Sequence, residues 1–152
     1  MRNFALTIGG NAPGTFEVLL MSLVVITLVA FCRNACAFEP QVNYMLQCMG
    51  CHAPDGQGEP GHVPSVQASL LPFAKLTAGR SYLVQVPGAA QSTLSDAELA
   101  QLLNWMISNL SATKSDRFSR FTAAEVAKYR HAPLVQVTAA REALLRQMNG
   151  SR

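Results

Sequence analysis

The sequence of 152 residues predicts a small all-α protein, and three stretches support that prediction. Ser95 and Glu98 form a capping box, and the apolar residues after it recur at helical spacing: Leu99, Leu102, Leu103, Met106, Ile107 and Leu110. Thr122 and Glu125 have the same spacing and open a short helix that ends near Arg130. Residues 139–148 form a last predicted helix, with Gly150 as its stop signal.

The composition excludes several classes of protein. Apolar residues make up 49% of the chain and charged residues only 14%, which is incompatible with a disordered or collagen-like chain. The net charge of +3 is too small for a protein that binds nucleic acid through charge alone. We therefore expect a globular domain with no nucleic-acid partner.

The N-terminal part of the chain has the features of an export signal. Residues 18–32 carry no charge, but this run of 15 residues is shorter than the ~20 that a membrane-spanning helix needs. Ala35 and Ala37 have the A-x-A spacing of a signal-peptidase site. We predict that residues 1–37 are a signal peptide cleaved after Ala37 and that the mature protein is periplasmic. The alternative is an uncleaved membrane anchor, the only membrane contact that we expect.

The segment Cys48-Met49-Gly50-Cys51-His52 is a C-x-x-C-H motif, the attachment site of a c-type haem. Its two thiols can form thioethers with the two vinyl groups on one edge of the porphyrin. The histidine that follows then becomes the proximal iron ligand. A thioredoxin-like dithiol would need a β-α-β setting, and a zinc site would need two more ligands. We therefore expect one covalent haem c on Cys48 and Cys51, with His52 as the metal ligand.

Several stretches around this motif resemble one protein family. Residues 44–47 precede the motif as the end of the family's first helix does, and residues 55–64 resemble its glycine-rich haem loop. Residues 94–99, with Trp105, resemble its last helix. Residues 40 to about 110 thus resemble a class I c-type cytochrome. The resemblance implies a class I cytochrome c-like helical domain over residues 38–113, wrapped around its haem. We expect Trp105 to pack against the first helix near Tyr44.

The resemblance also implies roles for two further cofactor-binding residues. Pro64 lies twelve residues after His52, a spacing at which the family's proline carbonyl accepts the Nδ1 hydrogen of the proximal histidine. Arg80 lies where family members approach a haem propionate, which a guanidinium pairs with through charge-assisted hydrogen bonds. The alternative for Arg80 is an exposed arginine, beside Tyr82 as a core residue.

The sequence departs from the family on the distal side of the haem. The family's distal methionine would fall near Ala89, but residues 81–93 contain neither methionine nor histidine. Met106 is better interpreted as a packing residue. His62 lies on the proximal side, and His131 lies in the C-terminal extension. We therefore expect water, no ligand, or an unassigned residue on the distal side of the iron.

Residues 114–152 form a basic helical C-terminal extension. They carry eight basic and three acidic residues, whereas residues 38–113 carry two basic and five acidic residues. The extension therefore has a net charge of +5 and the preceding domain one of −3. Two interpretations remain open: the extension packs on its own haem domain, or its charge orients an acidic redox partner during encounter.

These features predict a periplasmic monohaem electron carrier. It would transfer single electrons from a periplasmic dehydrogenase to a respiratory acceptor. We do not expect an enzyme, because no cluster of acid, base and nucleophile accompanies the haem loop. The alternatives are a haem protein whose open distal site binds or reduces a small ligand, and a structural subunit tethered by its extension.

Overall fold

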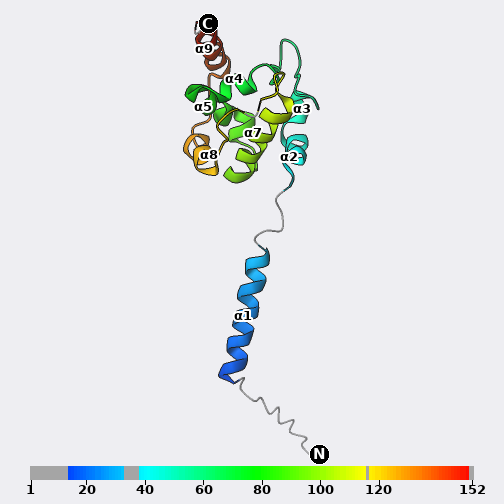
Figure 1. Cartoon of the computed structure of the whole chain (residues 1–152), viewed down its shortest axis with the longest axis vertical. Coiled ribbons are helices and arrows are strands. Elements are labelled where there is room, and N and C mark those ends of the chain that lie inside the picture. Colours follow the sequence, from blue (N-terminus) through cyan, green and yellow to red (C-terminus); the bar gives the residue numbers. More distant parts are fainter. Residues whose placement is uncertain (1–13, 33–37, 116, 151–152) are drawn as a thin grey trace, which may run out of the picture. The chain divides into compact units, whose positions relative to one another are not determined.

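The computed structural model describes residues 14–32, 38–115 and 117–150. The chain divides into two compact units, residues 1–37 and residues 38–152. The described residues contain helices and no β-strand, so the predicted all-α class is confirmed (Figure 1). Their helices are α1 (Thr15–Cys32), α2 (Pro40–Gln47), α3 (Met49–His52), α4 (Leu70–Ala74), α5 (Thr77–Gln85), α6 (Pro87–Ala90), α7 (Asp96–Leu110), α8 (Ala123–Arg130) and α9 (Val137–Gly150).

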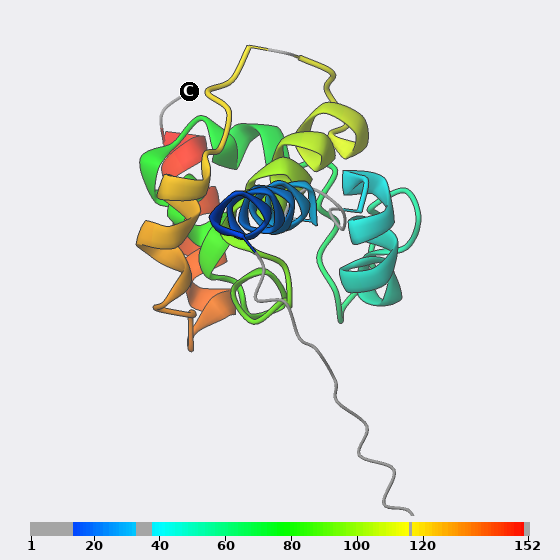
Figure 2. The same ribbon diagram turned by 90° about the horizontal axis from the view of Figure 1, so that it is seen from below.

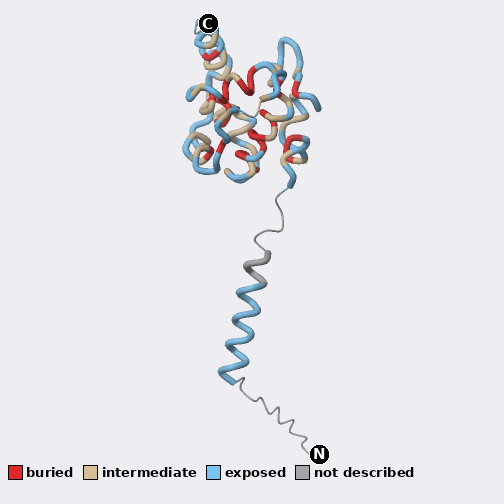
Figure 3. The backbone as a smooth tube through the Cα atoms, in the orientation of Figure 1, coloured by how far each residue is buried: buried red, intermediate tan, exposed pale blue. Residues whose placement is uncertain are grey.

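The first unit contains one helix, α1, which includes the uncharged run of the sequence. Its residues are exposed as far as their burial is described, from position 15 to position 27 (Figure 3). No helix within the described ranges is both long and apolar enough to span a membrane. The predicted cleavage site falls in residues 33–37, outside the described residues.

Helix α7 is the central element of the second unit and contacts α2, α4 and α8. In Figures 1 and 2, α2 and α3 lie on the opposite side of this unit from α8 and α9. The helix begins at the predicted capping box: Ser95 Oγ accepts from the Glu98 N–H, and the Glu98 carboxylate accepts from the Ser95 N–H at 2.8 Å. The apolar face predicted from the spacing is almost completely buried.

Two pairs of aromatic side chains pack in the core around α7. Trp105 packs on Tyr44 of α2 with ring centroids 5.6 Å apart, which confirms the predicted contact. Phe73 of α4 meets the edge of Tyr82 of α5 at 5.5 Å. Helix α5 can approach α4 this closely because residue 79 is glycine: a Cβ there would lie 2.3 Å from the Phe73 carbonyl oxygen.

The C-terminal extension packs into the same unit. Phe121 and Val126 are buried in the core, and α8 contacts both α5 and α7. Buried Asn104 of α7 holds the chain at Phe121 through two hydrogen bonds: its amide donates to the Phe121 carbonyl at 3.0 Å, and its side-chain oxygen accepts from the Phe121 N–H at 2.8 Å. Of the two interpretations of the extension, the structure therefore shows packing on the domain.

Two ion pairs join α8 to the helices it covers. Arg80 of α5 pairs with Glu125 at 2.5 Å, and Arg130 pairs with Asp96 at 3.0 Å. The first pair leaves the predicted capping box incomplete, because the Glu125 carboxylate accepts from Arg80. The Thr122 hydroxyl still accepts from the Glu125 N–H. Helix α9 begins at Val137, two residues before the predicted start.

We predict that Asn104→Ala lowers the free energy of unfolding of the haem-loaded protein by roughly 2–3 kcal/mol. The substitution leaves the buried N–H and C=O of Phe121 without partners. Asn109→Ala is the matched control on the same helix, because the side chain of exposed Asn109 bonds only the Trp105 carbonyl one turn away. Denaturant titration measures both variants, and equal losses would contradict the anchoring role of Asn104.

Candidate functional site

Residues 48–52 form one helical turn at the wall of a cavity. The N–H groups of Cys51 and His52 both donate to the Cys48 carbonyl, at 3.1 and 3.0 Å. Residues three and four positions apart lie on the same side of a helix, so the two cysteines and the histidine share one face. All three line a cavity of about 480 Å³.

The loop after this turn holds it in place. Tyr44 of α2 donates its hydroxyl hydrogen to the Ala53 carbonyl at 2.5 Å, and the Gly58 N–H donates to the His52 carbonyl at 3.1 Å. Ala53 has φ 57° and ψ 166°, a backbone conformation that residues other than glycine rarely adopt. The contacts of Tyr44 and Gly58 therefore hold a strained backbone directly after His52.

Gly58 also allows the close packing of the loop on itself. Its φ is +74°, and a Cβ at this position would lie 2.4 Å from the Val63 carbonyl oxygen and 3.0 Å from that of Pro64. A side chain here would push both carbonyls away. Gly58 thus positions the Pro64 carbonyl beside the turn that carries His52.

The walls of the cavity come from five parts of the second unit: the turn at 48–52, the loop at 62–70, the α5–α6 segment, α7 and α9. Most of the wall is apolar, and none of the residues that line it is Asp or Glu. The apolar side chains include Val63, Val66, Leu70, Leu83, Val86, Leu99, Leu102, Leu103, Met106 and Val137. An apolar cavity with a few converging polar groups is typical of a cofactor site.

The two cysteines do not have the properties of a redox-active dithiol. They form no disulfide with each other, and burial, followed by the neighbouring Cys51, raises the pKa of the Cys48 thiol to about 11. Reactive dithiol motifs instead have a nucleophilic cysteine whose pKa is lowered. Among the described residues no group of three or more His, Cys, Asp and Glu side chains could hold a metal ion. The zinc interpretation therefore has no support in this part of the chain.

His52 is prepared to bind a metal as a neutral imidazole. Burial lowers its pKa most; the Pro64 carbonyl acts in the opposite direction, and the Arg141 guanidinium lowers the pKa further. The ring is therefore neutral at pH 7, the form that ligates metals. Its Nδ1 atom is buried and makes no hydrogen bond, and the Pro64 carbonyl is the acceptor that raises the pKa of the ring.

The structure brings together four of the five residues expected from the sequence: Cys48, Cys51, His52 and Pro64 all line the cavity. Arg80 is not in this lining. Its guanidinium binds the Glu125 carboxylate and the Ser119 carbonyl and lies 3.9 Å from the centre of the Phe121 ring.

The cation that lines the cavity is Arg141 of α9, which sequence reasoning missed. Its position on the last predicted helix contained no signal for this role. Among the distal candidates, Met106 and His62 line the cavity and His131 does not.

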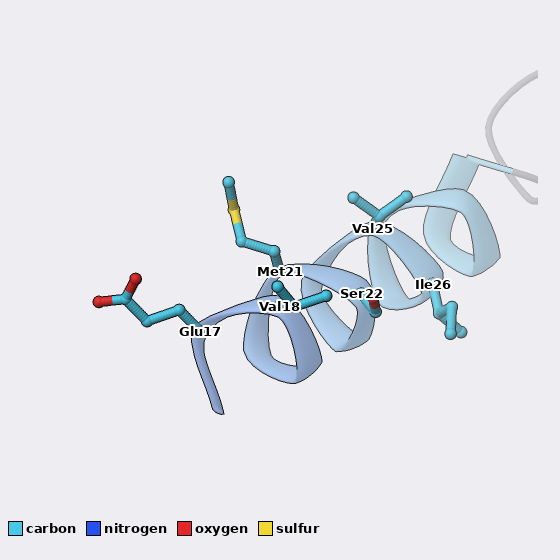
Figure 4. Close-up of a pocket in the computed structure, with 6 residues that line it drawn as sticks. All are labelled: Glu17, Val18, Met21, Ser22, Val25 and Ile26. Atoms are coloured by element: carbon cyan, nitrogen blue, oxygen red, sulfur yellow. The ribbon is translucent and has the colours of Figure 1, made fainter. Parts of the chain in front are cut away.

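A second depression, along α1, has no such convergence. Figure 4 shows its six side chains, all of which project from this one helix: Glu17, Val18, Met21, Ser22, Val25 and Ile26. They form a shallow surface without a second wall, and we assign no site to it.

Comparison with known proteins identifies two similar cytochromes. Cytochrome c-552 of Thermus thermophilus is 33% identical over an alignment of 119 positions, which covers 64% of this chain and 91% of that protein. A second cytochrome c-552, from one particular strain of the same species, is equally similar, with 80% of its length covered. No protein-family model matches the chain.

The alignment also shows that this chain is internally shorter than its relatives. The 64% that is aligned corresponds to about 97 of 152 residues, so at least about 22 of the 119 aligned positions have no counterpart in this chain. The connection between α5 and α7 in this chain spans residues 86–95 and contains the one-turn helix α6.

We predict that Gly58→Ala lowers the free energy of unfolding of the haem-loaded protein by about 2–4 kcal/mol. Its Cβ would overlap two carbonyl groups in a backbone conformation that already favours glycine. Gly61→Ala is the matched control, because Gly61 has φ +81° but nothing within 4 Å of its Cβ position. The control should lose only about 1–2 kcal/mol from backbone strain. Denaturant unfolding compares the two, and an equal loss would show that the loop is not tightly packed at Gly58.

Proposed function

This chain belongs to the c-type cytochrome family, and we propose that it carries single electrons between two redox proteins in the periplasm. The observation that supports this most directly is the single helical turn that presents Cys48, Cys51 and His52 to an apolar cavity. No other arrangement of side chains in the described residues combines two thiols and an imidazole on one face of a cavity.

The cofactor is one covalent haem c, and the residues of the cavity fit it. Cys48 and Cys51 would hold it through thioethers, and His52 would ligate its iron. The Pro64 carbonyl would accept a hydrogen bond from the buried Nδ1 atom of His52, and that bond would fix the ring. When bound, the group supplies a one-electron iron couple.

The protein's own part in electron transfer is to limit reorganisation and to leave a route to the surface. The apolar side chains of α5 and α7 exclude water from the cavity. Few water dipoles must therefore reorient when the cofactor gains or loses an electron. Cys51 is exposed while Cys48 is half-buried. The edge of the cavity at Cys51 is therefore the point at which a partner can approach the cofactor.

We propose a carrier and not an enzyme, because the cavity wall has no carboxylate that could act as general acid or base. The donor in this proposal is a periplasmic dehydrogenase and the acceptor a respiratory redox protein. Export follows from a signal over residues 1–37 that is cleaved after Ala37. The mature protein then comprises the cytochrome domain, residues 38–113, and the extension, residues 114–152.

A second candidate function is favoured by the short α5–α7 connection. This segment lines the cavity with Val86, Gly88, Ala89 and Ser92, none of which is a common ligand for haem iron. The distal side would then be open to a small uncharged ligand, unless Met106 of α7 reaches the iron.

A spectroelectrochemical titration of the purified protein tests both candidates. We predict one reversible one-electron wave, and a protein that accepts no electron contradicts the carrier function. Carbon monoxide should shift the spectrum of the reduced protein if the distal side is open. Met106→Leu should then leave the spectrum unchanged, as should the control Met148→Leu, since Met148 does not line the cavity. A methionine–iron charge-transfer band that disappears only in Met106→Leu would instead make Met106 the ligand.

A further inference from the structure

The turn that presents His52 ends in a backbone conformation that it cannot hold by itself. Helix α3 has only four residues, far fewer than an isolated helix needs to be stable. The residue that follows it, Ala53, lies in a region of positive φ that glycine adopts much more readily than alanine. Ala53 also precedes Pro54, and a residue in that position favours a negative φ. Contacts from outside the turn must therefore keep this backbone in place.

Tyr44 provides the contact that comes from another element. Its hydroxyl donates to the Ala53 carbonyl at 2.5 Å, and the His52 carbonyl lies 3.5 Å from the same hydroxyl oxygen. The second lone pair of the Ala53 carbonyl accepts from the Gly56 N–H at 3.2 Å, and the His52 carbonyl accepts from the Gly58 N–H at 3.1 Å. Both glycines belong to the loop itself, so Tyr44 of α2 is what connects these two carbonyls to the rest of the unit.

The position of the Tyr44 hydroxyl is set by the core and not by the loop. The Tyr44 side chain is only 1% exposed, and its ring packs on Trp105 of α7 with centroids 5.6 Å apart. Packing requires the ring alone, and a phenylalanine would fill almost the same volume. A hydroxyl in such a buried place is costly unless it is hydrogen-bonded. The partner of this hydroxyl lies directly after His52.

We propose that Tyr44 is a positioning residue for the proximal histidine: its hydroxyl fixes the backbone at Ala53 and thereby the plane of the His52 imidazole at the iron. The plane of such a ring depends on the backbone from which it projects and on the acceptor at its second nitrogen. Tyr44 supplies the first constraint, and the Pro64 carbonyl would supply the second. This inference rests on the proposed function, because it requires a haem iron bound to His52.

The test compares three variants of the haem-loaded protein. Tyr44→Phe removes the hydroxyl and keeps the ring. Tyr129→Phe is the matched control, since it removes the same group from a residue of α8 that does not line the cavity. Trp105→Phe alters the packing of the Tyr44 ring and keeps its hydroxyl.

The first readout is the proton NMR pattern of the haem methyl groups in the ferric protein saturated with cyanide. Cyanide is cylindrical and occupies the distal position, so the plane of the His52 imidazole determines how the four methyl shifts are spread. Tyr44→Phe should change the order or the spread of these shifts. Tyr129→Phe and Trp105→Phe should keep the wild-type pattern, even though Trp105→Phe unfolds more easily.

The second readout is hydrogen exchange at the Gly58 amide, which donates to the His52 carbonyl. Loss of one hydrogen bond should loosen the loop, so Tyr44→Phe should exchange this amide about three- to tenfold faster. Tyr129→Phe should leave the exchange rate unchanged. This readout reports the anchoring of the loop, whereas the methyl pattern reports the orientation of the ligand.

Several outcomes would overturn the proposal. An unchanged methyl pattern in haem-loaded Tyr44→Phe does so even if Gly58 exchanges faster, because the hydroxyl would then be only a structural contact. An equal change in Trp105→Phe would assign the effect to ring packing. If Tyr44→Phe yields no haem-loaded protein, the double variant Tyr44→Phe/Ala53→Gly should restore it, because glycine adopts positive φ without the hydroxyl; failure to restore it contradicts the proposal. A wild-type protein without covalent haem contradicts the proposed function itself.

Discussion

The apolar cavity beside the Cys48–His52 turn is the feature on which the second unit depends. Its volume is about 480 Å³, and five separate segments of the chain supply its walls. The apolar side chains that face this space come from the same helices that form the core of the unit. A resident group is therefore part of the core, and the turn that attaches it must lie at the cavity wall.

The C-terminal extension is directed inward to complete that wall. Asn104 fixes the chain at Phe121, the Arg80–Glu125 and Arg130–Asp96 pairs orient α8, and α9 then reaches the cavity. Partly buried ion pairs contribute more to geometry than to net stability, because desolvation offsets most of their attraction. Arg130 and Arg141 thus serve internal contacts. The net charge of +5 counted over residues 114–152 overstates the charge that the extension offers to a partner.

What could be predicted from the sequence was local. The attachment motif, the capping box at Ser95 and the apolar spacing of α7 depend on residues within four positions of one another, so the chain alone defines them. The ion pair of Arg80 depends on Glu125, which lies 45 positions away and is brought near by the packing of α8 on α5. The position of Arg141 at the cavity could not be predicted either, because the residues that share this cavity are distant from it in the sequence. The strained Ala53 and the tight contact at Gly58 are likewise properties of the folded loop.

The claim that a covalent cofactor completes this core is tested most directly by the intact mass of the protein recovered after export. We predict the mass of residues 38–152 plus one haem, with the colour retained by the protein after treatment with acidified organic solvent, because thioethers at Cys48 and Cys51 resist it. A mass without haem, or colour that the solvent extracts, would contradict the assignment of the cavity and of the turn that lines it.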